Sequence, residues 1–172
     1  MTGFDLAFER VVGHEGRFNA DPNDRGNWTS GVRGQGQLKG TKYGIAAMSY
    51  PALDIANLTL EQAKALYKRD LWDRAQADRY GPALAYQLFD IAVNSGITPA
   101  TRMLQRAAGV ADDGQVGRVT LTALNAMSAA EAILRLNAER LLFITALPTW
   151  PAYGRGWAKR VASNLQYGAA DA

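Results

Sequence analysis

The first sixteen residues contain a helical stripe that ends in a carboxylate. Its members follow at steps of four, three and four residues, and they are Phe4, Phe8, Val11 and Glu15. This spacing places side chains on one face of an α-helix. Gly16 comes next and predicts the end of the helix. The sequence therefore predicts an amphipathic helix from Phe4 to Glu15 whose last turn carries Glu15 on the core-facing side.

Such a position disfavours the ionised form of Glu15. The negative end of the helix dipole and partial burial both act against a charged carboxylate. A carboxylic acid that keeps its proton near neutral pH meets the first requirement of a general acid. The alternative is a structural carboxylate that turns to solvent or pairs with an arginine. The helix by itself leaves both interpretations open.

Further helices are predicted from residue 58 onward. Thr59 and Gln62 form a capping box before an amphipathic stripe, and residues 83–94 have the composition of a buried helix. Ser128 is placed to cap a long helix that runs through Leu147. Together with the first helix, these segments predict a mostly α-helical fold.

Residues 17–50 interrupt the helical pattern. They are rich in Gly, Asn, Asp and Ser, which predicts loops and turns with a short β-hairpin around Val32 to Tyr43. A loop of this length inside a compact domain is usually functional or disordered, and its carboxylates favour function. Within it, the glycine-rich segment Asn27–Gly40 is expected to form a mobile hairpin or flap at the rim of a cleft, outside the core.

Length and composition limit the chemistry. With 172 residues, the chain has room for one domain or for two small lobes that share a core. It contains no cysteine and one histidine, His14, so disulfides and thiolate metal sites are excluded and a conventional zinc site is not expected. No cofactor is predicted. The net charge of +3 favours anionic polymers but is too small to indicate nucleic acid.

Several stretches resemble, in the same order, the muramidases of glycoside hydrolase family 108, which include phage endolysins and secretion-associated muramidases. The N-terminal matches are His14-Glu15-Gly16, Asp21-Pro22-Asn23-Asp24 and Thr41-Lys42-Tyr43-Gly44-Ile45. The resemblance continues through residues 58–73 and 88–96. It covers nearly the whole chain and implies a lysozyme-like helical fold with a loop or small hairpin near the N-terminal catalytic helix.

The resemblance also implies which residues are catalytic. In this family the glutamate of the His-Glu-Gly stretch is the catalytic acid, which carries over to Glu15. The sequence is similar, more loosely, to phage-type lysozymes, in which a helix-end glutamate is followed nine residues later by an aspartate and then by a threonine. Asp24 stands nine residues after Glu15, and Thr41 is the candidate threonine. Thr29 competes for this role but lacks the Tyr-Gly-Ile element that follows Thr41.

Two features depart from the family pattern. Arg17 stands where a second glycine is usual, and the segment Asn27–Gly40 is an insertion before the Thr-x-Tyr-Gly-Ile element. Trp28, in this insertion, is a candidate platform for a sugar ring. Tyr43 is a further candidate for substrate binding.

Asp90 and Asn94 are also candidates for substrate binding. They are one turn apart in the helix predicted over residues 83–94, so both side chains could line a cleft. The alternative is an internal hydrogen-bonded pair that ties helices together. The sequence leaves both open.

Residues 102–124 resemble peptidoglycan-binding modules. The matching positions are Leu104-Gln105, Asp113-Gly114, Val116-Gly117, Thr120 and Leu124. The resemblance divides the chain into a catalytic part, residues 1–96, and a peptidoglycan-binding-like helical part, residues 97–172, packed as one globular unit. Helix–turn–helix packing would also require these glycines, so glycan binding by this part stays open.

The resemblance implies a lysozyme-type hydrolase that cleaves the β-1,4 bond between N-acetylmuramic acid and N-acetylglucosamine in peptidoglycan. Glu15 would be the general acid, Asp24 would position water or stabilise charge, and Thr41 would assist. Retaining or inverting stereochemistry is left open. Two alternatives remain: a lytic transglycosylase that uses Glu15 alone, and a non-catalytic wall-binding or secretion-assisting protein.

Access to the cell wall raises a separate question. No apolar run approaches the roughly 20 residues that span a bilayer, so stable membrane insertion is not expected. Asp5, Glu9 and Arg10 lie where a signal peptide would need an apolar core. We therefore expect a monomer that is made in the bacterial host cytoplasm and reaches the periplasmic wall through a holin or a secretion system.

Overall fold

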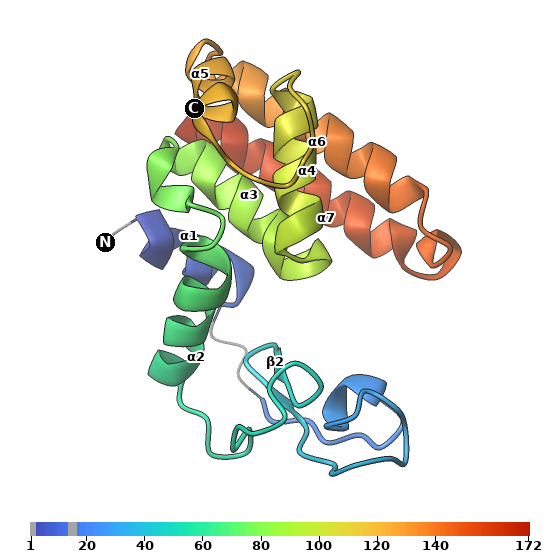
Figure 1. Cartoon of the computed structure of the whole chain (residues 1–172). Coiled ribbons are helices and arrows are strands. Elements are labelled where there is room, and N and C mark those ends of the chain that lie inside the picture. Colours follow the sequence, from blue (N-terminus) through green and yellow to red (C-terminus); the bar gives the residue numbers. More distant parts are fainter. Residues whose placement is uncertain (1–2, 14–16) are drawn as a thin grey trace. The chain divides into compact units, whose positions relative to one another are not determined.

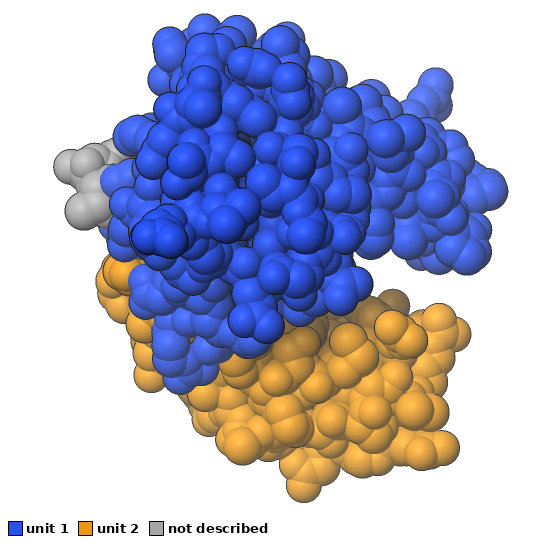
Figure 2. Space-filling model, turned by 45° about the horizontal axis from the view of Figure 1, so that its top comes forward, with its two compact units in different colours: residues 1–7, 69–172 blue, residues 8–68 orange. Residues whose placement is uncertain are grey.

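The computed structural model describes residues 3–13 and 17–172 and is mostly α-helical, as the sequence predicts (Figure 1). The chain forms two compact units, coloured separately in Figure 2. Unit 1 consists of residues 1–7 and 69–172, and unit 2 of residues 8–68. The boundaries of these units, after residues 7 and 68, do not coincide with the expected functional boundary between residues 96 and 97. That functional boundary stays a prediction.

The described residues of unit 1 form five complete α-helices and a short 3₁₀ helix, η3 (Ala77–Arg79). The helices are α3 (Pro82–Ser95), α4 (Ile97–Ala107), α5 (Arg118–Asn125), α6 (Ala129–Thr145) and α7 (Trp150–Asp171). The boundaries between the units fall inside α1 (Gly3–Val11) and inside a π-helical turn, η2 (Lys68–Trp72). None of the described helices is long and apolar enough to cross a membrane.

Helix α3 is the central helix of unit 1. Every residue from Ala83 to Ala92 is buried, and α3 packs against α4, α6 and α7. A helix that is apolar around most of its circumference is stable only when neighbours cover all its faces. Phe89 extends this core by edge-to-face ring contacts with Phe4, at 5.8 Å, and with Trp72, at 5.7 Å between centroids.

Unit 2 is built mainly of loops. Its regular elements are η1 (Arg25–Asn27), β1 (Thr41–Lys42), β2 (Ile45–Ala46) and α2 (Leu60–Tyr67). The hairpin predicted around Val32 to Tyr43 forms further along the chain, where β1 pairs antiparallel with β2. Tyr43 and Gly44 form its turn with φ of 52° and 75°, and this left-handed pair matches the twist of a two-residue hairpin.

The capping signals of two helices are confirmed. Thr59 and Gln62 exchange both bonds of a capping box at the start of α2, at 3.2 and 2.9 Å. Ser128 accepts a hydrogen bond from the backbone N–H of Glu131 at the start of α6. Helix α6 ends at Thr145, two residues before the predicted Leu147.

The N-terminal helix ends earlier than predicted. Helix α1 stops at Val11, and Gly13 adopts a φ of 59°, the left-handed conformation with which helices commonly end. Gly13, not the predicted Gly16, therefore follows the last turn of α1. Glu15 lies outside the described residues, so its predicted place on the core-facing side of the last helical turn is not part of α1 as described.

Candidate active site

Asn27 connects the regions of two predicted catalytic residues in unit 2. Its backbone N–H donates to the carbonyl of Asp24 at 3.2 Å, and its side-chain oxygen accepts from the hydroxyl of Thr41 at 2.7 Å. Asn27 is fully buried, so these bonds form away from water, where they are hard to replace. The structure thereby brings Asp24 and Thr41 to one shared partner.

Asp24 and Asp21 both lie on the exposed side of this arrangement. The carboxylate of Asp24 caps η1 by accepting a 2.8 Å bond from the backbone N–H of Gly26. The carboxylate of Asp21 accepts from the backbone and side-chain amides of Asn23, at 2.9 and 3.1 Å. Asp21 is also tied to Asn27, whose side-chain amide donates to the Asp21 carbonyl at 3.0 Å. Both carboxylates are thus oriented by short-range turns.

The hydroxyl of Thr41 has a defined direction. Since its hydrogen is donated to Asn27, its remaining capacity is that of an acceptor. A water beside Thr41 would therefore donate to it and keep a lone pair for another contact. Backbone bonds in both directions between Thr41 and Asn19, at 2.8 and 2.9 Å, hold the residue in place.

Tyr43 and Trp28, predicted to bind substrate, also belong to unit 2. Tyr43 occupies the hairpin turn, and its carbonyl accepts a 3.0 Å bond from the hydroxyl of Tyr67. Trp28 is half-buried, and its indole N–H donates to the carbonyl of Pro22 at 2.9 Å. A pinned indole of this kind presents a fixed ring face.

The segment Asn27–Gly40 folds back on itself. Trp28 and Leu38 form an antiparallel bridge, and the carbonyl of Asn27 accepts from the backbone N–H groups of Lys39 and Gly40 at 2.9 and 3.0 Å. Both ends of the segment are buried, while residues 32–38 are exposed. Its base therefore belongs to the packed part of unit 2, and only its tip has the exposure expected of a flap.

A pocket of about 330 Å³ lies in unit 2 next to this segment. Its lining residues are Phe18, Leu38, Lys39, Ala52, Asp54, Ile55 and Ala56. Phe18 and Leu38 are exposed apolar side chains, with 46% and 39% of their surface accessible. Hydrogen bonds from Asn57 lower the pKa of Asp54, so the pocket combines an ionised carboxylate with apolar faces. Polar groups beside exposed rings are typical of carbohydrate contacts.

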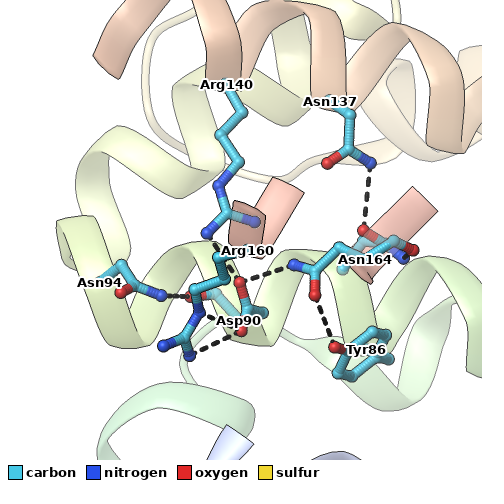
Figure 3. A network of polar contacts seen from close by, with 8 residues as sticks. Tyr86, Asp90, Asn94, Asn137, Arg140, Arg160 and Asn164 are labelled. Carbon is cyan, nitrogen blue, oxygen red and sulfur yellow. Dashed lines mark hydrogen bonds and ion pairs between the residues drawn. The ribbon is translucent and has the colours of Figure 1, made fainter. Parts of the chain in front are cut away.

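Asp90 lies in unit 1 at the centre of a polar network (Figure 3). Only 2% of the residue is exposed. One carboxylate oxygen contacts Arg160 at 2.7 Å, and the other contacts Arg140 and Asn164, both at 2.7 Å. Both oxygens are therefore used inside the protein, which agrees with the structural alternative for this residue.

Asn94 differs from Asp90 in its accessibility. Its side-chain amide donates to the backbone carbonyl of Asp90 at 2.7 Å, but the residue is exposed and lines a small pocket of unit 1. The structure thus joins the two residues through a backbone bond and leaves Asn94 available at the surface.

Several side chains that organise unit 2 and the Asp90 network do not stand out in the sequence. Asn27 could have been found from its spacing, because it follows Asp24 by three residues and an aspartate often caps a turn of that length. Phe18 follows Glu15 by three residues, but one exposed ring gives no periodic signal. Arg140 pairs with Asp90 across 50 residues, which a single sequence does not reveal. Among the described residues, no group of three or more His, Asp or Glu side chains could hold a metal ion.

Comparisons with known proteins assign the chain to a family. A sequence model described as Glycosyl hydrolase 108 matches residues 8–96, which include Glu15, Asp24 and Thr41. A solved structure, that of Brucella abortus SagA, is similar with 27% identity and a TM-score of 0.81, over 98% of this chain and 94% of that chain. No curated protein matches. Because the family match spans more than half of the 172 residues, the chain belongs to the glycosyl hydrolase 108 family.

Proposed function

We propose that the protein is a muramidase that hydrolyses the β-1,4 bond between N-acetylmuramic acid and N-acetylglucosamine in peptidoglycan. Family membership already makes it a glycoside hydrolase and supports peptidoglycan as the substrate. The observation that carries the finer proposal is the shared contact of Asp24 and Thr41 with the buried Asn27. The bond to the Asp24 backbone ties the loop that carries the Asp24 carboxylate to the strand that carries the Thr41 hydroxyl. A carboxylate and a hydroxyl acceptor are groups suited to hold a water for attack on a sugar.

The proposed mechanism uses one acid and one base. Glu15 gives its proton to the leaving glycosidic oxygen as the bond to the anomeric carbon breaks. A water that donates one hydrogen bond to Thr41 and the other to Asp24 attacks the anomeric carbon from the opposite face. Asp24 takes the proton that this water loses. This route inverts the configuration at the anomeric carbon.

Side chains in unit 2 are proposed to bind the glycan. Trp28 and Tyr43 are candidate ring contacts, and Phe18 adds an exposed ring at the 330 Å³ pocket. The net charge of +3 favours approach to anionic wall polymers. We also propose that the enzyme acts as a monomer on the periplasmic wall, with access through a holin or a secretion system.

Substitutions at the three carboxylates test these roles. Glu15→Gln is expected to lower the rate of peptidoglycan hydrolysis by about 10²- to 10⁴-fold, the usual contribution of a general acid. Asp24→Asn is expected to cost more activity than the matched change Asp21→Asn, with both proteins melting close to wild type. A Glu15→Gln rate within about tenfold of wild type would remove Glu15 from the mechanism, and the reverse ranking would move the base to Asp21.

A further inference from the structure

The network around Asp90 contains more positive than negative charge. Its single carboxylate pairs with the guanidinium groups of Arg140 and Arg160, so the three groups together carry a charge of +1. Arg160 is partly exposed, whereas the Arg140 side chain is only 4% exposed. Nη2 of Arg140 binds Asp90, but its Nη1 has no hydrogen-bond partner among the described residues. A buried guanidinium donor without a partner is costly, which points to a ligand that completes it.

Arg140 also lines a pocket of about 50 Å³. The other lining residues are Asn94 and Ser95 at the end of α3, Ile144 of α6, Leu147, and Trp157 of α7. The volume is suited to a carboxylate group and is too small for a sugar ring. The C-terminal end of α3 contributes about half a negative charge, which is smaller than the net charge of +1 of Asp90, Arg140 and Arg160 together. An anion is therefore favoured over a cation.

Aromatic rings continue from this pocket to the surface. Trp157 lies 6.2 Å from Trp150 and 5.8 Å from Tyr153, measured between ring centroids, in tilted contacts. Tyr153 is 60% exposed. The ring of Trp150 packs over Gly154, where a Cβ would approach ring atoms to 2.6 Å, so this indole is held against its own helix. Such a row of rings offers apolar faces for stacking on a sugar.

We propose that this pocket of unit 1 binds an acidic saccharide, with the carboxylate on Arg140 and Asn94 and the sugar ring on Trp157 and Tyr153. The choice of saccharide rests on the proposed function. It is N-acetylmuramic acid, which as a free sugar carries a lactyl carboxylate. The site would hold a muramic acid residue whose lactyl carboxylate is free, as in glycan from which the stem peptide has been removed, independently of cleavage. An ordered water on Nη1 is the competing explanation, and it would give no preference for a charged sugar.

Titration with two monosaccharides separates these explanations. N-acetylmuramic acid and N-acetylglucosamine differ by the lactyl group, and neither contains a bond for a muramidase to cut. Nuclear magnetic resonance can follow the indole N–H of Trp157 during each titration. We expect saturable binding of N-acetylmuramic acid that is about tenfold or more tighter than that of N-acetylglucosamine, because a charge-assisted hydrogen bond is lost without the carboxylate. Equal binding of the two sugars, or no saturable binding, would overturn the proposal.

Variants then test the residues. Arg140→Lys keeps a positive charge beside Asp90 but removes the forked guanidinium, so affinity for N-acetylmuramic acid should fall about tenfold. Leu142→Ala is the matched control, because Leu142 is exposed and lies on another face of α6. Asn94→Ala and Tyr153→Ala change exposed side chains. Their affinities for N-acetylmuramic acid test the proposal if Arg140→Lys does not fold. Wild-type affinity in both of these would contradict the proposal. Analysis of peptidoglycan fragments would still test the cleavage separately.

Discussion

The hydroxyl of Thr41 donates a 2.7 Å hydrogen bond to the side chain of Asn27, a residue with no exposed surface. Asn27 also bonds the backbone of Asp21, Asp24, Lys39 and Gly40. One buried amide therefore fixes the direction of the Thr41 hydroxyl and joins the loop that contains the aspartates to the strand that contains the threonine. The proposed water-binding geometry depends on this residue.

Replacement of Asn27 by alanine should destabilise the protein. The Thr41 hydroxyl and the Asp21 carbonyl each lose a partner, and an unsatisfied buried group costs about 1–3 kcal/mol. Urea unfolding would measure the change. Asn23→Ala is the control, since Asn23 is exposed and also bonds Asp21, and it should change the free energy of unfolding by less than about 0.5 kcal/mol. Equal effects of the two substitutions would show that Asn27 has no special structural role.

Shortening the tip of the inserted segment should leave the fold intact. Replacing residues 31–36 by a short Gly-Ser link keeps the Trp28–Leu38 bridge and the buried Asn27. Loop-closure entropy changes slowly with length, so the free energy of unfolding should change by less than about 1 kcal/mol. Activity on intact peptidoglycan should fall through a higher KM. Removal of all of residues 27–40 should unfold unit 2, and a stable protein after that deletion would contradict the described packing.

Two glycines of α7 should respond oppositely to alanine. A Cβ on Gly168 would lie 2.8 Å from Cγ2 of Ile133, whereas a Cβ on Gly156 would contact no described residue within 4 Å. Gly168→Ala should therefore destabilise the protein by about 1–3 kcal/mol through overpacking. Gly156→Ala should stabilise it by about 0.5–1 kcal/mol, because alanine is the better helix former. Chemical denaturation of both variants checks the sign of each effect.

Tyr80 should make stability depend on pH under alkaline conditions. Burial raises the pKa of Tyr80 from 10.0 to about 12, against a smaller opposite effect of Arg79. Because the folded state holds this proton more tightly, the contribution of Tyr80 is fully present below pH 10 and is lost as the pH rises toward about 12. Tyr80→Phe should lose less stability than wild type between pH 9 and pH 11.5, measured by thermal melting. Parallel losses in the two proteins would contradict this assignment.

Local sequence signals predicted the start of α2 better than the end of α1 and the position of the hairpin. The capping box of Thr59 and Gln62 acts within one turn, so neighbouring residues determine it. The end of α1 was misplaced because Gly13 and Gly16 give the same signal, and the earlier glycine adopts the left-handed conformation. The hairpin was misplaced because Tyr43 has a positive φ, which is uncommon for a residue other than glycine.

The surroundings of Asp90 show what local signals omit. The residue was correctly placed in a buried helix, because the apolar composition around it is local. Its partners Arg140, Arg160 and Asn164 follow 50, 70 and 74 residues later. Only the packing of α3 against α6 and α7 brings these side chains together, so their pairing could not be derived from spacing. Glu15, the predicted acid, lies outside the described residues, so its role stays a prediction from its spacing and from the family resemblance.

The chemistry of the cut ends tests the central claim most directly. Purified peptidoglycan would be digested with the wild-type protein and with Glu15→Gln, and the released fragments analysed by mass spectrometry. The proposed mechanism predicts fragments with reducing N-acetylmuramic acid ends from the wild type, and few or none from the variant in the same time. Anhydro-muramic acid ends, reducing N-acetylglucosamine ends, or no fragments from the wild-type protein would contradict it.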